Sequence, residues 1–197
     1  MTTTTTNRFA TREDWLVQAV AELRPVFSAL NHPLPDNIRV ACGFPSSNAR
    51  AAHRRAIGEH WSDKASADQH HEILISPVVD DPIKVLGTLV HELAHAATDG
   101  DGHKGRFPAL VRSLSLEGKP TATVEGEKFK AEYQPLLEDL GVYPHAALNA
   151  GRKAKTQSTR MLKAACPHCG YTVRLSAKWA AVGLPECPVD GVELILS

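Results

Sequence analysis

The sequence has few cysteines and no long apolar run. Only 4 of its 197 residues are cysteine, and Met1 is followed by five threonines and an asparagine. Such a start predicts neither a signal peptide nor a membrane span. Closely spaced cysteines in a reducing compartment are more often metal ligands than disulfides. We therefore expect a cytoplasmic protein that does not contact a membrane.

Acidic residues are missing from one long stretch of the chain. The formal net charge is zero, yet no Asp or Glu lies between Leu140 and Pro185. The stretch contains seven basic residues: Arg152, Lys153, Lys155, Arg160, Lys163, Arg174 and Lys178. Such a block predicts contact with the phosphate backbone of DNA without sequence specificity, and a solvated linker is the alternative. Tyr171 and Trp179 lie in the same stretch, where they would either stack on bases or form a small core.

The length leaves room for one domain with a core and for a small appendage. A domain of about 100 to 150 residues can bury a core, whereas the remaining residues are too few to do so alone. A bound metal would allow the appendage to fold. We expect a disordered N-terminus at residues 1–11, the main domain at 12–140, a basic linker at 141–158 and a small module at 159–197.

The apolar pattern predicts an α+β fold with a small sheet and several helices. Helical spacing predicts helices at residues 12–30, 106–116 and 125–140. Short apolar runs predict strands at residues 38–42, 57–61 and 73–75. Four further histidines lack a spacing that specifies a metal, so we expect them at surface or strand positions: His53, His60, His70 and His71.

The sequence His91-Glu92-Leu93-Ala94-His95 is an HExxH motif. Asp81 and Pro82 predict the start of the helix that carries it. Two histidines four residues apart share one helical face, so both rings can bind one metal ion. In this arrangement Glu92 is not a ligand but the base that takes a proton from the metal-bound water. The motif predicts a catalytic zinc site, and a pair of solvated surface histidines is the alternative.

A catalytic zinc usually has three protein ligands and one open position. A metzincin would have Gly and His three and six residues after the second histidine, where this chain has Thr98 and Asp101. The next histidine is His103, and the glycines around it allow a sharp turn back toward the helix. We predict His103 as the third ligand. Asp99, Asp101 and Glu117 are the alternatives, because thermolysin-like enzymes use two histidines and a glutamate.

The C-terminal segment contains a second candidate metal site. Cys166 and Cys169 form a C-x-x-C motif, and Cys187 and Asp190 repeat its shape with Asp in place of the second cysteine. Two such motifs at this separation are typical of a structural zinc site. We predict a second zinc bound by the three thiolates, with Asp190 as a weaker fourth ligand. His168 as the fourth ligand and a site without metal are the alternatives.

These motifs resemble the SprT-like family, the Spartan-type zinc metalloproteases. The resemblance depends on Thr88–Ala96, on the glycine-flanked His103 followed by Phe107, and on the cysteine-rich C-terminal segment. It implies a compact metalloprotease domain followed by a zinc ribbon, with proteolysis of DNA-associated proteins, including DNA–protein crosslinks. The family pattern has a fourth cysteine where this chain has Asp190.

The family resemblance also implies site residues: zinc bound by His91, His95 and His103, with Glu92 as the base. The expected function is that of a zinc-dependent endopeptidase, in which Glu92 assists the attack of metal-bound water on a peptide carbonyl. A second oxyanion donor is expected, and we consider Tyr133, Tyr143 and His145 as candidates. The competing hypothesis is a catalytically silent adaptor that binds nucleic acid through its basic zinc ribbon.

Overall fold

The computed structural model describes residues 8–49, 51, 55–150 and 161–197. The chain divides into two compact units, residues 1–152 and 153–197. In the first unit, a three-stranded sheet has the order β1-β3-β2. β1 (Ile38–Cys42) and β3 (His71–Ile75) are parallel, and β2 (Gly58–Trp61) is antiparallel to β3. β2 is therefore an edge strand.

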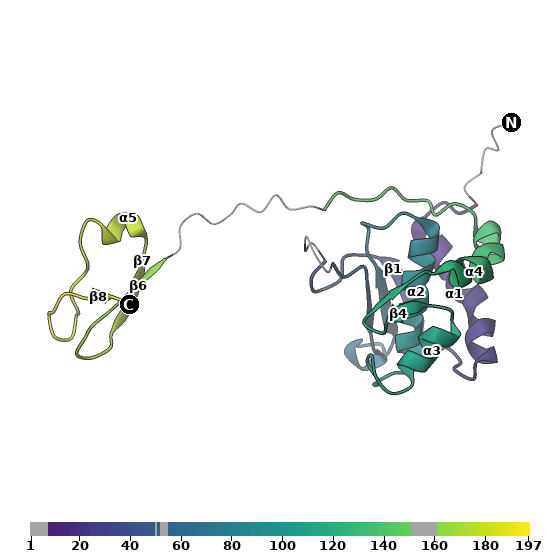
Figure 1. Cartoon of the computed structure of the whole chain (residues 1–197), viewed down its shortest axis with the longest axis horizontal. Helices are drawn as coiled ribbons and strands as arrows, with labels where there is room; N and C mark the ends of the chain where they lie inside the picture. Colours follow the sequence, from purple (N-terminus) through teal and green to yellow (C-terminus); the bar gives the residue numbers. More distant parts are fainter. Residues whose placement is uncertain (1–7, 50, 52–54, 151–160) are drawn as a thin grey trace. The chain divides into compact units, whose positions relative to one another are not determined.

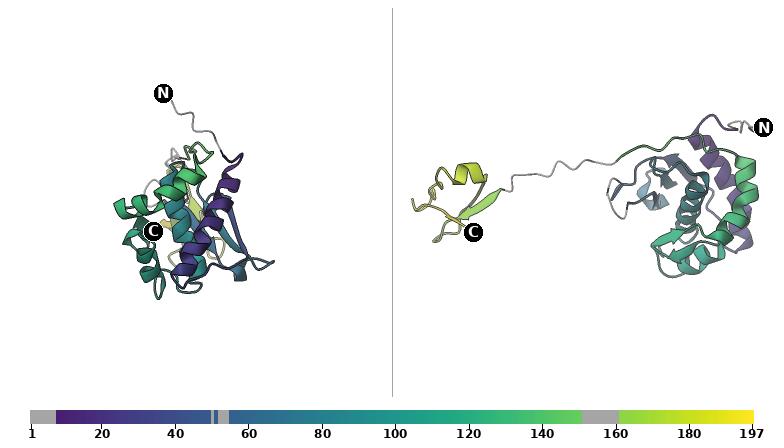
Figure 2. Two further views of the ribbon diagram at one scale, coloured as in Figure 1. Left: turned by 90° about the vertical axis from the view of Figure 1, so that its right-hand side faces the viewer. Right: turned by 45° about the horizontal axis from the view of Figure 1, so that its top comes forward.

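The helix α2 (Pro82–Ala97) lies in the middle of the first unit, where it packs against β2 and β3 and also contacts the helices α1 (Arg12–Ala29) and α4 (Glu127–Leu140) (Figures 1 and 2). The Asp81 side chain caps it by accepting a hydrogen bond from the Ile83 amide, and Pro82 occupies the first turn, where its missing N–H costs nothing. Its apolar side is fully buried, with Leu86, Leu89 and Leu93 at 0 % exposure. Burial of this helix from several sides fixes its position against the sheet.

The other helices of the first unit cover the same core. α1 (Arg12–Ala29) begins with a capping box formed by Thr11 and Asp14. α3 (Phe107–Ser113) follows the loop that leaves α2, and α4 (Glu127–Leu140) ends at Gly141. A short hairpin of β4 (Glu117–Lys119) and β5 (Ala122–Val124) connects α3 to α4.

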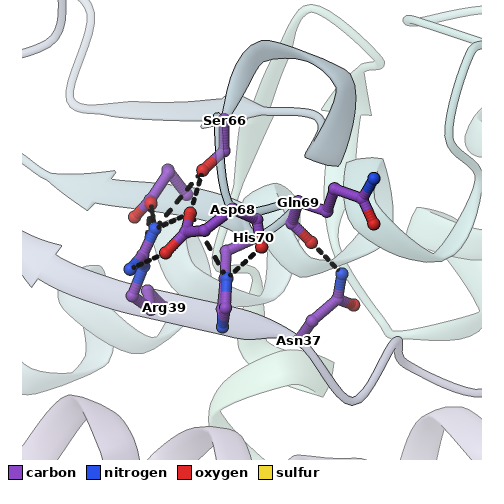
Figure 3. Close-up of polar contacts among 7 residues, drawn as sticks. Asn37, Arg39, Ser66, Asp68, Gln69 and His70 are labelled. Atoms are coloured by element: carbon purple, nitrogen blue, oxygen red, sulfur yellow. Dashed lines mark hydrogen bonds and ion pairs between the residues drawn. The ribbon is translucent and has the colours of Figure 1, made fainter.

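A polar network joins the outer face of the sheet to the segment between β2 and β3, which contains the short 3₁₀ helix η1 (Asp63–Ala65) (Figure 3). Arg39 donates hydrogen bonds to Asp68 and to Glu72, and Ser66 donates to Asp68 at 2.6 Å. The Asn37 amide donates to the Gln69 carbonyl. These contacts are exposed, so their role is to fix the loop and not to supply much stability.

The second unit is a small antiparallel sheet of order β7-β6-β8. Its strands are β6 (Leu162–Ala165), β7 (Thr172–Leu175) and β8 (Ile195–Leu196), and the one-turn helix α5 (Ala177–Ala180) follows β7. The buried residues of its core are Ala164, Cys166, Cys187 and Leu194. A core of this size is too small to hold a fold alone, as expected for a module that depends on a metal.

The α+β class with a small sheet is confirmed, and two boundaries differ from expectation. Arg8 pairs with Asp139 at 2.8 Å, although residues 1–11 were expected to be disordered. Tyr143 is buried with its ring edge-on to Trp15, so the expected linker at 141–158 begins as part of the first unit. Across the described residues, none of the helices has the length and apolar character needed to cross a membrane.

Candidate functional site

Three histidines meet at the C-terminal half of α2. His91 and His95 lie one turn apart on the helix, and His103 comes from the following loop. Each offers a ring nitrogen, and the three nitrogens lie within 4.8 Å of one another. The ring centroids of His95 and His103 are 4.7 Å apart, and those of His91 and His103 are 5.5 Å apart. The structure thus brings together the three predicted ligands.

The loop after α2 turns back because its glycines adopt positive φ. Gly100, Gly102 and Gly105 have φ of 87°, 56° and 54°, a region that side chains with a Cβ rarely adopt. Asp101 fixes the turn by accepting hydrogen bonds from the Arg106 amide at 2.8 Å and from its guanidinium at 2.9 Å. His103 is therefore held opposite the helix by backbone geometry.

The donor set fits a zinc ion. Burial lowers the pKa of His91 to about 4 and that of His95 to about 3, so both rings are neutral at pH 7 and carry free lone pairs. The ring of Phe107 stacks on His95 with centroids 4.1 Å apart and forms an apolar wall. Three neutral imidazoles with room for one more group are the arrangement of a catalytic zinc site.

The carboxylates considered as alternative third ligands do not join the histidine group, although Asp99 lines the same cleft. Asp101 is paired with Arg106, and Asp99 lies 3.5 Å from Lys64. The Glu117 side chain lies beside Gly126: a Cβ added to Gly126 would be 2.0 Å from Glu117 Oε1. Within the part of the chain that the structure describes, none of the three joins the histidine group.

Glu92 lies next to the histidines and is only 7 % exposed. Burial, with a smaller contribution from the charge of Glu59, raises its pKa to about 8. Its carboxylate lies against the backbone of β2, where a Cβ added to Gly58 would be 2.4 Å from Glu92 Oε1 and 2.6 Å from Thr88 Cγ2. Glycine at position 58 therefore makes the space that Glu92 occupies.

A cleft of about 1070 Å³ contains Glu92 and all three histidines. One wall is β2 with the residues before it, and another is α2. The third wall is the β4–β5 hairpin, which contributes Lys119, Thr123 and the following Glu125. The sequence analysis did not predict this hairpin, because its strands are only three residues long and carry no alternating apolar pattern.

His60 is a cleft residue that the sequence analysis treated as an ordinary strand residue. Its ring lies parallel to that of His95, with centroids 6.2 Å apart. Its Nε2 atom is 2.9 Å from Nδ1 of His71, a side chain that is 5 % exposed. Burial lowers the pKa of His60 to about 4. Only the pairing of β2 with β3 brings these residues together, so no spacing in the sequence indicates them.

The three candidates for a second oxyanion donor do not line the cleft. Tyr133 is buried against Phe129, and Tyr143 is buried against Trp15. His145 lies 2.8 Å from the Pro77 carbonyl through its Nε2 atom. These predictions were wrong, because nothing in the sequence specified the side of α2 on which the three residues pack.

The C-terminal unit brings its predicted ligands together. Cys166, Cys169, Cys187 and Asp190 each offer an atom within 4.8 Å of the others. Cys169 Sγ is 3.4 Å from Cys187 Sγ, and Cys166 Sγ is 3.2 Å from Asp190 Oδ2. His168 is exposed, with Nδ1 3.6 Å from Asp190 Oδ2. Three thiols and a carboxylate suit a zinc ion.

The predicted basic surface is described only in part. Arg152, Lys153, Lys155 and Arg160 lie outside the described residues. Lys163 on β6 and Arg174 on β7 are exposed and directly opposite each other in the ladder. The Lys178 ammonium lies 5.2 Å from the ring centroid of Trp179, which is 60 % exposed.

A comparison with models of protein families, with curated proteins and with solved structures finds no match to this chain. The geometry of the two metal-ligand groups is therefore the basis for any functional conclusion.

We expect the metal-free first unit to be most stable at about pH 6.5 to 7. In the folded state His60, His91 and His95 have low pKa values, whereas in the unfolded chain a histidine has its ordinary pKa of about 6.5. Between these values the unfolded chain binds more protons than the folded one. The stability of the first unit therefore falls as the pH drops from about 6.5 toward 4. The raised pKa of Glu92 acts in the opposite direction. The folded state keeps a proton that the unfolded chain releases, so stability falls as the pH rises toward 8.

Urea unfolding in the presence of a chelator measures this profile, followed by tryptophan fluorescence, in which Trp15 is the buried residue and Trp61 and Trp179 are already exposed in the folded state. Glu92→Gln should remove the decrease above pH 6.5 and leave the decrease on the acid side. A profile that is flat from pH 4 to 9 would contradict the expectation.

We expect Asp190→Cys to tighten the C-terminal zinc site, because a fourth thiolate is a softer ligand than a carboxylate. The rate of zinc loss to a chelator should fall, whereas Asp190→Ala should increase it. His168→Ala is the matched control and should change little. Elemental analysis should find two zinc ions per chain, and a count of one that disappears with His91→Ala would show that the C-terminal site does not bind zinc.

Proposed function

We propose that this protein is a zinc-dependent endopeptidase of the SprT-like type. The observation that supports the proposal is the meeting of His91, His95 and His103 beside the buried carboxylate of Glu92 in one open cleft. A ligand group alone would suit a structural site. A buried carboxylate that is not part of the ligand group suits a site that performs chemistry.

The protein residues have distinct tasks in this proposal. When bound, zinc supplies Lewis-acid activation of the attacking water and of the substrate carbonyl. The three imidazoles hold the ion through neutral nitrogens. Glu92 accepts the proton of the attacking water at its carboxylate and delivers it to the nitrogen of the leaving amine. Gly58 leaves the space in which that carboxylate lies.

The environment of Glu92 suits a group that both accepts and returns a proton. An ordinary glutamate, with a pKa near 4.5, holds a proton too weakly at neutral pH to act as an effective acid. Burial moves the pKa of Glu92 upward, toward the pH at which an acid–base catalyst works best, and a bound cation would move it partly back. The residue is therefore placed for proton transfer and not for binding the metal.

The C-terminal unit would direct the peptidase to DNA-associated proteins. Lys163 and Arg174 are opposite each other, which is unfavourable for two like charges unless an anion lies near both. Trp179 exposes most of its ring beside Lys178. Cations next to an exposed aromatic ring suit a single nucleic-acid strand, whose phosphates and bases they contact together.

The second candidate function is that of a nucleic-acid-binding adaptor without catalysis, and the exposed Trp179 favours it as much as it favours a targeted peptidase. The two proposals differ in what Glu92 does. An adaptor would not need an acid in the cleft, and the loss of Glu92 would leave its zinc content and its nucleic-acid binding intact.

We expect Glu92→Gln to abolish peptide hydrolysis and to retain the zinc of the first unit, because it removes the base and leaves the ligands in place. The loss of rate should be at least about 100-fold. His91→Ala, His95→Ala and His103→Ala should lose both activity and that zinc. Casein hydrolysis and elemental analysis of the same samples measure the two properties.

His70→Ala is the matched control for the ligand variants, since His70 lies outside the cleft and should keep zinc and activity. Full activity of Glu92→Gln would refute the peptidase mechanism. Full zinc content and activity of His103→Ala would require a different third ligand.

We expect binding to single-stranded DNA that weakens steeply with salt. On a single strand, each Lys or Arg that contacts a phosphate adds about 0.7 to the slope of log affinity against log salt, so Arg174→Ala and Lys163→Ala should each lower the slope by about 0.7. Trp179→Ala should weaken binding by about 1 to 3 kcal/mol with little change in slope. Fluorescence anisotropy with a labelled oligonucleotide measures both quantities.

Lys130→Ala, in the first unit, is the control and should leave the affinity unchanged. Equal affinities of the wild type and all three ribbon variants at low salt would place the DNA contact elsewhere or exclude it.

A further inference from the structure

The β4–β5 hairpin contacts the metal-ligand group directly. Thr123 on β5 has its Oγ1 atom 2.9 Å from Nδ1 of His91. An imidazole has two nitrogens, and the hydrogen bond made by one decides which nitrogen is left for a metal. With Nδ1 of His91 engaged by the hydroxyl of Thr123, Nε2 is the atom that remains for the ion.

We propose that Thr123 is a positioning residue for the metal site, which holds the ring of His91 in the orientation and tautomer that a zinc ion requires. The inference rests on the proposed function to the extent that it assumes zinc at the histidine group. Thr123 does not touch the substrate or the ion in this role. It acts through His91.

The direction of the hydrogen bond follows from the chemistry of the ring. A neutral imidazole carries its proton on one nitrogen, and only the other nitrogen has a lone pair for a metal. When Nε2 of His91 binds an ion, Nδ1 carries the proton and donates it to Oγ1 of Thr123. The hydroxyl proton of Thr123 then rotates away, as hydroxyl groups can.

A second contact holds Thr123 in place. Glu125, two residues further along the chain, has a side chain that is 10 % exposed and pairs with Lys84 of α2 at 3.0 Å. Gly87 leaves the space for this carboxylate, since a Cβ there would be 2.2 Å from Glu125 Oε1. Gly87 precedes His91 by four residues, so the Glu125 carboxylate contacts α2 about one helical turn before His91.

The segment from β5 to Glu125 is therefore attached to α2 at two points about two turns apart, by the ion pair of Glu125 with Lys84 and by the hydrogen bond between Thr123 and His91. The ion pair is largely buried on the Glu125 side, where it is screened less by solvent than an exposed pair would be. Fixing the hairpin backbone in this way keeps the Thr123 hydroxyl from moving away from His91. The sequence signal is weak, because Thr123 and Glu125 lie about 30 residues or more from the helix they contact.

The test compares Thr123→Val, which keeps the shape but removes the hydroxyl, with Thr123→Ser, which keeps the hydroxyl. The measured quantity is the zinc affinity of the histidine site in the full chain, by competition with a chelator. The His91→Ala protein provides the zinc binding of the C-terminal site alone, which is subtracted. Unfolding of each metal-free variant in urea provides its stability.

We expect Thr123→Val to weaken zinc binding at the histidine site about 10-fold or more, as is usual when the partner of a metal-bound histidine is lost. Thr123→Ser should bind zinc within about threefold of the wild type, and Thr121→Val, in the same hairpin, should do the same. The metal-free stability of Thr123→Val should change much less than its zinc affinity. Glu125→Gln should weaken zinc binding in the wild type but have no further effect in Thr123→Val, because both act through one contact.

Wild-type zinc affinity in Thr123→Val would overturn the inference. It would also be overturned if Thr123→Ser failed to rescue, or if metal-free stability fell in parallel with affinity, since Thr123 would then serve only to pack the hairpin. A wild-type chain with no more zinc than His91→Ala would refute the proposed function together with the inference. Zinc binding without peptide hydrolysis would refute the peptidase alone and leave the role of Thr123 intact.

Discussion

Burial of α2 is the constraint on which the rest of the first unit depends. The helix contributes an apolar side to the core and the motif histidines to a cleft, and both tasks are performed by the same turns. Because Leu89 and Leu93 are fully buried, the helix cannot rotate without exposing them. The orientation of His91 and His95 is therefore set by packing on the other side of the helix, and the loop with His103 only has to return to a fixed position.

The histidine group and the C-terminal ligand group differ in whether the ligands are part of the hydrophobic core of their unit. The three histidines of the first unit lie outside its hydrophobic core, so that core is complete without a bound metal. In the second unit, Cys166 and Cys187 are themselves half of the buried core. Metal loss would thus leave the first unit folded and would remove much of what organises the second.

The sequence predicted those parts of the structure that depend on local patterns. The position of α2, the strands β1 and β3 and both ligand groups follow from apolar periodicity and from the spacing of His and Cys. The contacts that shape the cleft cannot be predicted from such local patterns. Gly58, His60 and Thr123 come from segments whose pairing with α2 or β3 is long-range, and neither their residue types nor their neighbours distinguish them. The prediction of Tyr133 and Tyr143 as oxyanion donors was wrong for the same reason, since the sequence does not distinguish a tyrosine in a core from one in a cleft.

The position of the Glu92 carboxylate depends on Gly58, a residue outside the HExxH motif. A Cβ at that position would lie less than 3 Å from side-chain atoms of Glu92 and Thr88, so any other residue must displace these side chains. The HExxH motif and all three histidines would remain unchanged in such a protein, and the candidate metal ligands would still be in place. If the proposed peptidase is correct, a larger residue at the start of this edge strand would remove proton transfer and leave the metal ligands in place, so an intact HExxH motif alone would not identify a working enzyme.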